Sequence, residues 1–315
     1  MSMNRFFGFF LTAAVTAAGL QSCTQDDIVD SNVAAAENDA SIKQYISQNS
    51  GTTTAPLTYT TNGTGMYYAI TKANPTGKRP STGEEVTFSY TLYDLQNRAL
   101  DSSKTGNLPF FTFGLNSLLS GLQEGIASLR EGEKARLLIP SYLAYGSQAQ
   151  TTFTLPANSP IRFDVELVSS RTEEQQIANY ISSTALASSL SLTAPPTNIQ
   201  QSTSGLRLIK TVTNPSGATI SSGQSVTLNY TGQTLRAVTP FDKSTDGTFS
   251  FFLGRNQLIP GFEEGVLQLR VGEKATLVFP SSIGYGTNGA RNSNGVYVIL
   301  PYAPLRFDIA VINAK

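Results

Sequence analysis

Apolar and polar residues alternate in two short stretches near the end of the chain. In 225–231 the apolar positions are Val226, Leu228 and Tyr230, and 306–312 has the same alternation. Because successive side chains of a β-strand point to opposite faces, this spacing predicts strands with one buried face. Such half-buried strands are typical of antiparallel sheets.

Between these strands the apolar positions follow a helical spacing. One stripe is formed by Leu258, Ile259, Phe262, Val266 and Leu269, and the same spacing recurs between 118 and 129. We therefore expect one short helix that packs on a curved antiparallel sheet in each half of the chain. This layered arrangement belongs to the α+β fold class.

Two more helical stripes lie upstream of these regions. They occupy 40–49 and 172–190, with the apolar residues Ile42, Tyr45, Ile46 and Ile177, Tyr180, Ile181. The i, i+3, i+4 spacing predicts helices with one apolar face, and each such face needs a surface to cover. The stretch TAPPTN at 193–198 breaks the second helix.

The chain repeats itself at an offset of 140 residues. GLQEGIASLREGEKARLLIPSYLAYG at 121–146 returns as GFEEGVLQLRVGEKATLVFPSSIGYG at 261–286, and Tyr90 matches Tyr230 at the same offset. After the second block the offset grows to 144, so the second copy carries four extra residues. They fall in 287–298, whose Gly and Asn content predicts a loop.

The repeat predicts two domains, one over 66–170 and one over 206–315. A helical segment and its connection occupy 41–65, and a helix and linker occupy 171–205. The length of 315 residues agrees with two domains, each long enough to bury a core of its own.

The composition restricts the chemistry of the chain. Lys plus Arg and Asp plus Glu both number 22, so no charge excess marks a nucleic-acid partner. With no His and one Cys, the chain lacks the commonest general base and an internal disulfide, and no metal site or cofactor is expected. The remaining functions are binding and a form of catalysis that depends on the environment of a pocket.

The first residues read as an export signal. Arg5 precedes about 15 apolar or small residues, too short a run for a spanning helix. LQSC at 20–23 resembles the lipobox of bacterial lipoproteins, which implies a signal peptide over 1–22 and a lipid on Cys23. The alternative is an ordinary secretory signal with an incidental Cys. The acidic stretch that follows predicts a flexible tether over 23–40.

A series of short motifs in the second half follows a recognisable order. They are YTG, FD, FxFxLG, LIPGFEEG, VGEKATLVFP, GYG and FDI. This order resembles the FK506-binding-protein (FKBP) family of peptidyl-prolyl isomerases, over nearly all of 206–315 and less closely over 66–170. The resemblance implies tandem domains, each an antiparallel half-barrel of five or six strands around a short helix, with a ligand pocket between helix and sheet.

The resemblance also implies which residues form the pocket of the second domain. The catalytic positions are Tyr230, Phe241, Asp242, Ile259, Phe262, Tyr285 and Phe307, and further substrate contacts are Phe249, Leu258 and Ile299. Phe262 is expected to form the floor, where many relatives have Trp. The Ile259 N–H and the Tyr285 hydroxyl are expected to bind carbonyl groups of the ligand.

The first domain matches this set less well. Its positions are Tyr90, Leu100, Asp101, Leu118, Leu119, Leu122, Tyr145, Leu155 and Phe163. Leu100 and Leu122 replace aromatic walls, and Pro109 replaces Phe249 unless Phe110 is displaced into that place. Because aromatic faces grip prolyl rings, a weakened or purely binding pocket is expected there.

Position alone does not separate pocket residues from core residues. Phe249, Leu258, Ile259 and Ile299 can serve packing and pocket alike. Asp101 and Asp242 can also be turn formers that bind nearby backbone N–H groups.

The resemblance implies a prolyl isomerase that assists the folding of exported proteins at their proline-containing segments. Rotation about an amide bond needs no covalent step, so the lack of His is no obstacle. The alternative is a binding or chaperone module without turnover. The expected location is the bacterial cell envelope, lipid-anchored at the outer membrane on its periplasmic or outer side.

Overall fold

The computed structural model describes residues 31–52, 55–115 and 117–315. This part of the chain divides into two compact units. The first contains residues up to Thr82 together with Val86–Ser170, and the second contains Gly83–Glu85 together with Arg171–Lys315. Each unit has its own sheet and its own hydrophobic core.

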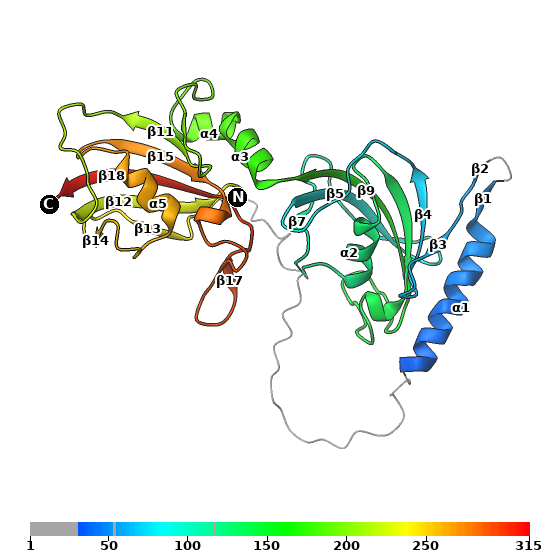
Figure 1. Cartoon of the computed structure of the whole chain (residues 1–315). Helices are drawn as coiled ribbons and strands as arrows, with labels where there is room; N and C mark the ends of the chain where they lie inside the picture. The colour runs from blue at the N-terminus through cyan, green and yellow to red at the C-terminus, as the bar shows by residue number, and fades with distance from the viewer. Residues whose placement is uncertain (1–30, 53–54, 116) are drawn as a thin grey trace, which may run out of the picture. The chain divides into compact units, whose positions relative to one another are not determined.

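The core of the second unit is a seven-stranded antiparallel sheet with the short helix α5 (Pro260–Leu267) packed on it (Figure 1). The strands are β10 (Gln200–Gln201), β11 (Arg207–Val212), β12 (Ser225–Thr234), β13 (Asp242–Ser244), β14 (Ser250–Phe252), β15 (Lys274–Phe279) and β18 (Leu305–Ala314). Their spatial order is β10-β11-β15-β18-β12-β13, and β14 also pairs with β12. A 3₁₀ turn, η2 (Ser281–Ile283), follows β15.

The first unit repeats this topology around the helix α2 (Ser120–Ala127). Its strands are β3 (Thr60–Thr61), β4 (Tyr67–Lys72), β5 (Glu85–Asp94), β6 (Ala99–Ser102), β7 (Phe110–Thr112), β8 (Lys134–Ile139) and β9 (Ile161–Arg171), and a 3₁₀ turn, η1 (Ser141–Leu143), follows β8. The order is β3-β4-β8-β9-β5-β6, with β7 paired to β5. The predicted α+β fold class is confirmed; short edge strands raise the strand number above the expected five or six.

Close contact between helix and sheet explains a glycine that both copies contain. A Cβ added to Gly265 in α5 would lie 2.2 Å from a methyl carbon of Leu277 in β15. A Cβ on Gly125 in α2 would lie at the same distance from Leu137 in β8. Real Cβ atoms do not approach so closely, so only glycine lets each helix lie directly on its sheet.

Each sheet is covered on its other face by the helix that precedes it in the chain. Along β15, Leu277 and Phe279 face the main core, while Val278 packs with Ile177 and Ile181 of α3 (Glu173–Ile181). The period-2 geometry of a strand places these neighbours on opposite faces. The apolar stripe of the predicted helix therefore finds its surface on the outer face of the sheet.

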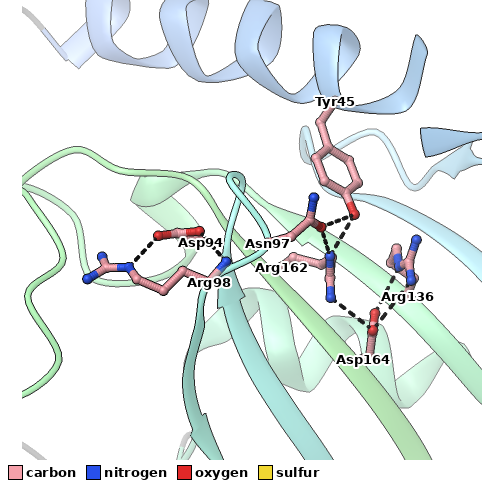
Figure 2. A network of polar contacts seen from close by, with 7 residues as sticks. All are labelled: Tyr45, Asp94, Asn97, Arg98, Arg136, Arg162 and Asp164. Carbon is pink, nitrogen blue, oxygen red and sulfur yellow. Dashed lines mark hydrogen bonds and ion pairs between the residues drawn. The ribbon is translucent and has the colours of Figure 1, made fainter. Parts of the chain in front are cut away.

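The first unit uses α1 (Ser31–Asn49) in the same way, with Ile42 and Tyr45 against Leu138 of β8. Figure 2 shows the polar contacts below this helix. The buried Arg162 donates from Nη1 to the Tyr45 hydroxyl at 2.8 Å and also to the side-chain oxygen of Asn97. Its guanidinium lies 3.7 Å from the centroid of the Tyr93 ring.

The start of α1 differs from the sequence-based expectation. The flexible tether expected over 23–40 is wrong for residues 31–40, which are helical. Ala34 and Asn38 are buried there, and the Asn38 amide accepts from the Ser141 N–H at 2.5 Å and donates to the Asn158 carbonyl at 2.9 Å. These contacts come from residues about a hundred positions away, so no local pattern predicts them.

Two further expectations are corrected. The helix expected over 172–190 is divided into α3 and α4 (Thr184–Ser189), because the Ser183 side chain caps a new helix by accepting from the Leu186 N–H. The loop expected over 287–298 contains a hairpin of β16 (Ala290–Arg291) and β17 (Tyr297–Ile299). A second hairpin, β1 (Gly51–Thr52) with β2 (Ala55–Pro56), follows α1.

The predicted signal peptide over 1–22 and Cys23 lie outside the described residues. Among the described residues, none of the helices is both long enough and apolar enough to cross a membrane.

Candidate functional site

A cavity of about 450 Å³ opens between α5 and the inner face of the sheet in the second unit. Nine of the predicted pocket residues line it together with Gln257 and Pro260, namely Tyr230, Phe241, Asp242, Phe249, Leu258, Ile259, Phe262, Tyr285 and Phe307. The predicted contact Ile299 is not in this lining; it is 2% exposed and belongs to the core. Gln257 and Pro260 carried no signal in the sequence beyond their place before the helix.

Aromatic rings form the walls and floor of this cavity, and they hold one another edge to face. The centroids of Phe262 and Phe307 lie 5.1 Å apart at 82° between the ring planes, and those of Phe241 and Phe307 lie 5.7 Å apart at 81°. Phe262 and Phe307 are almost completely buried, while Phe241 is only partly buried. Edge-to-face packing is a favoured geometry for aromatic pairs, so the walls are preorganised.

The Tyr230 hydroxyl is engaged inside the protein. It donates to Oδ2 of Asp242 at 2.5 Å, while Oδ1 of the same carboxylate accepts from the Lys243 N–H at 2.8 Å. Burial and the nearby carboxylate raise the pKa of Tyr230 well above its ordinary value. Asp242, the first residue of β13, thus binds both the backbone N–H of the next residue and the hydroxyl of a tyrosine in the cavity lining.

Two hydrogen-bond donors at the cavity make no hydrogen bond to any other described residue. They are the Tyr285 hydroxyl and the backbone N–H of Ile259, which is the N-cap residue of α5. Burial raises the pKa of Tyr285 above its ordinary value, which favours the protonated hydroxyl that can donate a hydrogen bond. The site thus offers two donors in a mainly apolar cavity, a combination suited to carbonyl groups of a ligand.

Glu263 supports the segment that leads to Ile259. Its carboxylate, which is 8% exposed, accepts from the Gly254 N–H at 3.1 Å and from the Leu258 N–H at 3.3 Å. These bonds tie the loop before α5 to the helix itself. Sequence reasoning missed this residue, since a Glu in a first helical turn is common at the surface.

The corresponding site of the first unit keeps its polar pair but not its aromatic walls. The Tyr90 hydroxyl donates to Oδ2 of Asp101 at 2.6 Å, and the Tyr90 ring lies 5.6 Å from that of Phe163. Leu119 is the N-cap residue of α2, and Leu122 packs into the core from that helix. Burial raises the pKa of Tyr145 to about 12.

Backbone hydrogen bonds decide which residue stands in the place of Phe249. In the second unit the Leu228 N–H donates to the Phe249 carbonyl at 3.1 Å, and in the first unit the Phe88 N–H donates to the Pro109 carbonyl at 3.2 Å. Pro109 therefore corresponds to Phe249, and the alternative of a displaced Phe110 is wrong.

One aromatic residue of the first unit was not expected. The Phe153 ring packs against the core and lies 5.6 Å from the Tyr145 ring. It belongs to the loop between β8 and β9, where the two copies differ in length, so alignment of the repeats provided no partner for it.

The residues around both sites match one protein family. The model of the FKBP-type peptidyl-prolyl cis-trans isomerases matches residues 77–168 and 217–312. The chain is 28% identical over 231 residues to the peptidyl-prolyl cis-trans isomerase FKBP9 of Homo sapiens, covering 72% of this chain and 34% of that protein. It thus spans about a third of the length of this relative. It is 39% identical over 95 residues to Fkbp12 of Drosophila melanogaster, covering 30% of this chain and 82% of that protein.

Solved structures with similar chains include the three FKBP domains of wheat FKBP73 and FkpA from Escherichia coli. The wheat structure is 19% identical with a TM-score of 0.38, covering 82% of this chain and 99% of that one. The FkpA structure is 29% identical with a TM-score of 0.36, covering 44% of this chain and 61% of that one.

Proposed function

Because this chain belongs to the family of FKBP-type peptidyl-prolyl cis-trans isomerases, we propose that its second unit catalyses the cis–trans isomerisation of X–Pro bonds in polypeptides. The observation that carries this proposal is the open aromatic cavity beside the N-terminus of α5, with two donors that no other described residue engages. A sealed aromatic interior would have excluded a substrate.

The reaction is a rotation, which fits the residues present. Resonance in the amide sets a barrier of about 18–20 kcal/mol, and an unassisted X–Pro bond takes tens to hundreds of seconds to isomerise. No bond to the enzyme is required and no proton has to move. The chain accordingly needs no histidine, and it contains none.

An apolar cavity lowers this barrier by excluding water. The planar amide is more dipolar than the twisted transition state, so water stabilises the planar ground state more than an apolar site does. The rings of Phe241, Phe262 and Phe307 supply such surroundings for the prolyl ring and its amide. Each 1.4 kcal/mol of preferential stabilisation, roughly, accelerates the rotation tenfold.

The two donors hold the substrate in register. The Ile259 N–H and the Tyr285 hydroxyl bind carbonyl oxygens of the peptide on either side of the rotating bond. Asp242 keeps the Tyr230 hydroxyl engaged, so the Tyr230 ring serves as a wall. Catalysis in this scheme comes from shape, desolvation and orientation.

The first unit is proposed to bind proline-containing or apolar segments with little or no turnover. The observation that favours this second function is that the aliphatic Leu100 and Leu122, which correspond to Phe241 and Phe262, pack in the core of the first unit, with Pro109 in the place of Phe249. Two linked sites of unequal chemistry gain effective concentration for a single client chain. This is the chaperone-like alternative, confined to one unit.

The proposal is tested on the full chain with a protease-coupled X–Pro peptide assay. Phe241→Ala and Tyr285→Phe are compared with the matched substitutions Leu100→Ala and Tyr145→Phe in the first unit. The proposal requires that the first pair lowers kcat/KM at least several-fold and that the second pair leaves it nearly unchanged. No acceleration by the wild-type chain, or equal losses from both pairs, contradicts it.

We further propose that the protein assists folding of exported polypeptides from a lipid anchor at Cys23 in the bacterial cell envelope. The support is the run of apolar residues after Arg5 followed by LQSC at 20–23. Lipidation contributes about 0.8 kcal/mol per buried CH₂, so several acyl chains hold a protein stably at a membrane.

A further inference from the structure

Glu173 reaches from α3 to the turn that precedes Tyr285. One carboxylate oxygen accepts from the Ser281 N–H at 2.6 Å and the other accepts from the Ser281 hydroxyl at 2.8 Å. Ser281 is 4% exposed, so these bonds lie largely out of solvent. Hydrogen bonds to a charged group that is partly desolvated are among the stronger ones in proteins.

Ser281 in turn holds the backbone on both sides of Tyr285. The Ser281 carbonyl accepts from the Gly284 N–H and from the Gly286 N–H, each at 2.8 Å. Ser281 also opens η2, the 3₁₀ turn that ends just before this tyrosine. The position of the Tyr285 backbone therefore depends on the position of Ser281.

The helix that carries Glu173 is a firm support. Ile177 is fully buried and packs with Val278 of β15. The Tyr180 hydroxyl accepts from Nη1 of Arg306 in β18 at 2.8 Å. Thr172 and Gln175 form a capping box at the first turn of the helix, next to Glu173.

The same device occurs in the first unit with a different residue. Asn38 stands four residues before Ile42 in α1, as Glu173 stands four residues before Ile177 in α3. Its side-chain oxygen accepts from the Ser141 N–H at 2.5 Å, and the Ser141 carbonyl accepts from the Gly146 N–H at 2.7 Å. Both units thus tie the turn before the pocket tyrosine to their preceding helix, although neither helix lies within the family-matched residues.

We propose that Glu173 is a positioning residue of the second unit, holding Ser281 so that the Tyr285 hydroxyl stays at the cavity. The proposal rests on the isomerase function proposed above and adds the helix before the domain to its machinery. Glu173 does not touch the substrate. It acts through Ser281 and the two glycine amides that flank Tyr285.

The first measurement does not depend on activity. Hydrogen exchange of the full chain is followed by mass spectrometry in peptides that cover 281–286 and 141–146. Glu173→Ala is expected to raise the exchange rate in 281–286 several-fold and to leave 141–146 unchanged, while Asn38→Ala does the reverse. Unchanged exchange in 281–286 of Glu173→Ala overturns the proposal.

The second measurement is a double-mutant cycle on kcat/KM for an X–Pro peptide. The chains are wild type, Glu173→Ala, Tyr285→Phe and the double variant. We expect Glu173→Ala to lower kcat/KM three- to tenfold when Tyr285 is present and to have no further effect in the Tyr285→Phe background. Glu173→Gln, which keeps an acceptor for the Ser281 N–H, is expected to restore most of the rate.

A purely structural role predicts a different result. If Glu173→Ala lowers kcat/KM by the same factor in both backgrounds, the residue supports the fold and not the tyrosine, and the proposal is overturned. If Tyr285→Phe itself has no effect, the proposed catalytic use of this pocket fails, and the exchange measurement still reports on the link between Glu173 and Ser281. The two failures are thereby distinguishable.

Discussion

Leu122 in α2 and Phe262 in α5 occupy equivalent positions of the two corresponding helices, and both are almost completely buried, at 5% and 3% exposed. Phe262 packs edge to face on Phe307, at 5.1 Å between ring centroids. Leu122 is aliphatic, so it forms no aromatic pair with Phe163 in the first unit. The position that gives an aromatic ring to the cavity lining of the second unit is therefore aliphatic in the first unit.

Phe262→Leu tests whether this difference matters for catalysis. We expect kcat/KM for an X–Pro peptide to fall about tenfold, corresponding to roughly 1.4 kcal/mol, because an aromatic contact with the prolyl ring is lost. Leu122→Met changes the equivalent position of the first unit without adding a ring. It serves as the control and is expected to leave kcat/KM unchanged. An equal rate for Phe262→Leu and wild type would exclude the ring as a determinant of turnover.

Gly265→Ala tests the close approach of α5 to the sheet. The new Cβ would meet Leu277 at 2.2 Å, so the helix has to move, and we expect a loss of about 1–3 kcal/mol in the free energy of unfolding. Leu277→Val in the same chain makes room at the Cβ and is expected to recover part of this loss. The measurement is urea unfolding, and a double variant that loses the sum of the two single effects would argue against a steric cause.

The pH dependence of stability depends on Glu173. Burial raises the pKa of its carboxyl above the ordinary value of 4.5, while the Ser281 hydrogen bonds oppose this only in part. The folded state thus binds the proton of Glu173 more tightly than the unfolded state does. The contribution of this proton to the free energy of unfolding is therefore full below pH 4.5, and it is lost as the pH rises through the pKa of the folded state.

Glu173→Gln isolates this contribution, because the amide does not titrate. The difference in unfolding free energy, variant minus wild type, is expected to grow from acidic to neutral pH. Glu174 on the same helix is paired with Arg207 and is present in both chains, so the comparison changes position 173 alone. A difference that is constant between pH 4 and pH 7, followed by chemical denaturation, would contradict the raised pKa.

Tyr45→Phe tests the bond between α1 and the buried Arg162. The guanidinium loses the hydroxyl acceptor at 2.8 Å, and we expect a loss of about 1–3 kcal/mol in unfolding free energy, as for other hydrogen bonds to buried charges. Tyr180→Phe is the matched change in the second unit, where Arg306 donates to that hydroxyl. Tyr68→Phe removes a hydroxyl without a hydrogen bond to the described residues and is expected to change stability by less than about 0.5 kcal/mol.

Cys23→Ser tests the proposed lipid anchor. In a host that processes lipoproteins, the variant is expected to appear in the soluble fraction without incorporated fatty acid, while the wild-type chain sediments with membranes. Metabolic labelling with a fatty-acid analogue and fractionation are the measurements. A Cys23→Ser chain that remains tightly membrane-bound would refute anchoring through this thiol.

The sequence by itself determined the fold class, the duplication and most of the cavity lining of the second unit. These features depend on local periodicity and on short motifs. Both can be recognised in the sequence, because the apolar residues of strands and helices repeat with different periods. Alternation along strands gave Tyr230 and Phe307 a buried face, and the resemblance of the motif order to the FKBP family then implied that both lie at one pocket. The same reasoning misplaced Ile299, which lies in the core, because an apolar residue at such a position serves core packing as well as a pocket.

Only the tertiary structure decided which distant groups meet. Asn38 was assigned to a tether because its neighbours have no apolar period, yet its amide is buried against Ser141 and Asn158. Glu173 looked like a surface carboxylate of a first helical turn and instead holds Ser281. Such polar contacts join residues over a hundred positions apart, and their free energy depends on burial and exact geometry, neither of which is written in local sequence.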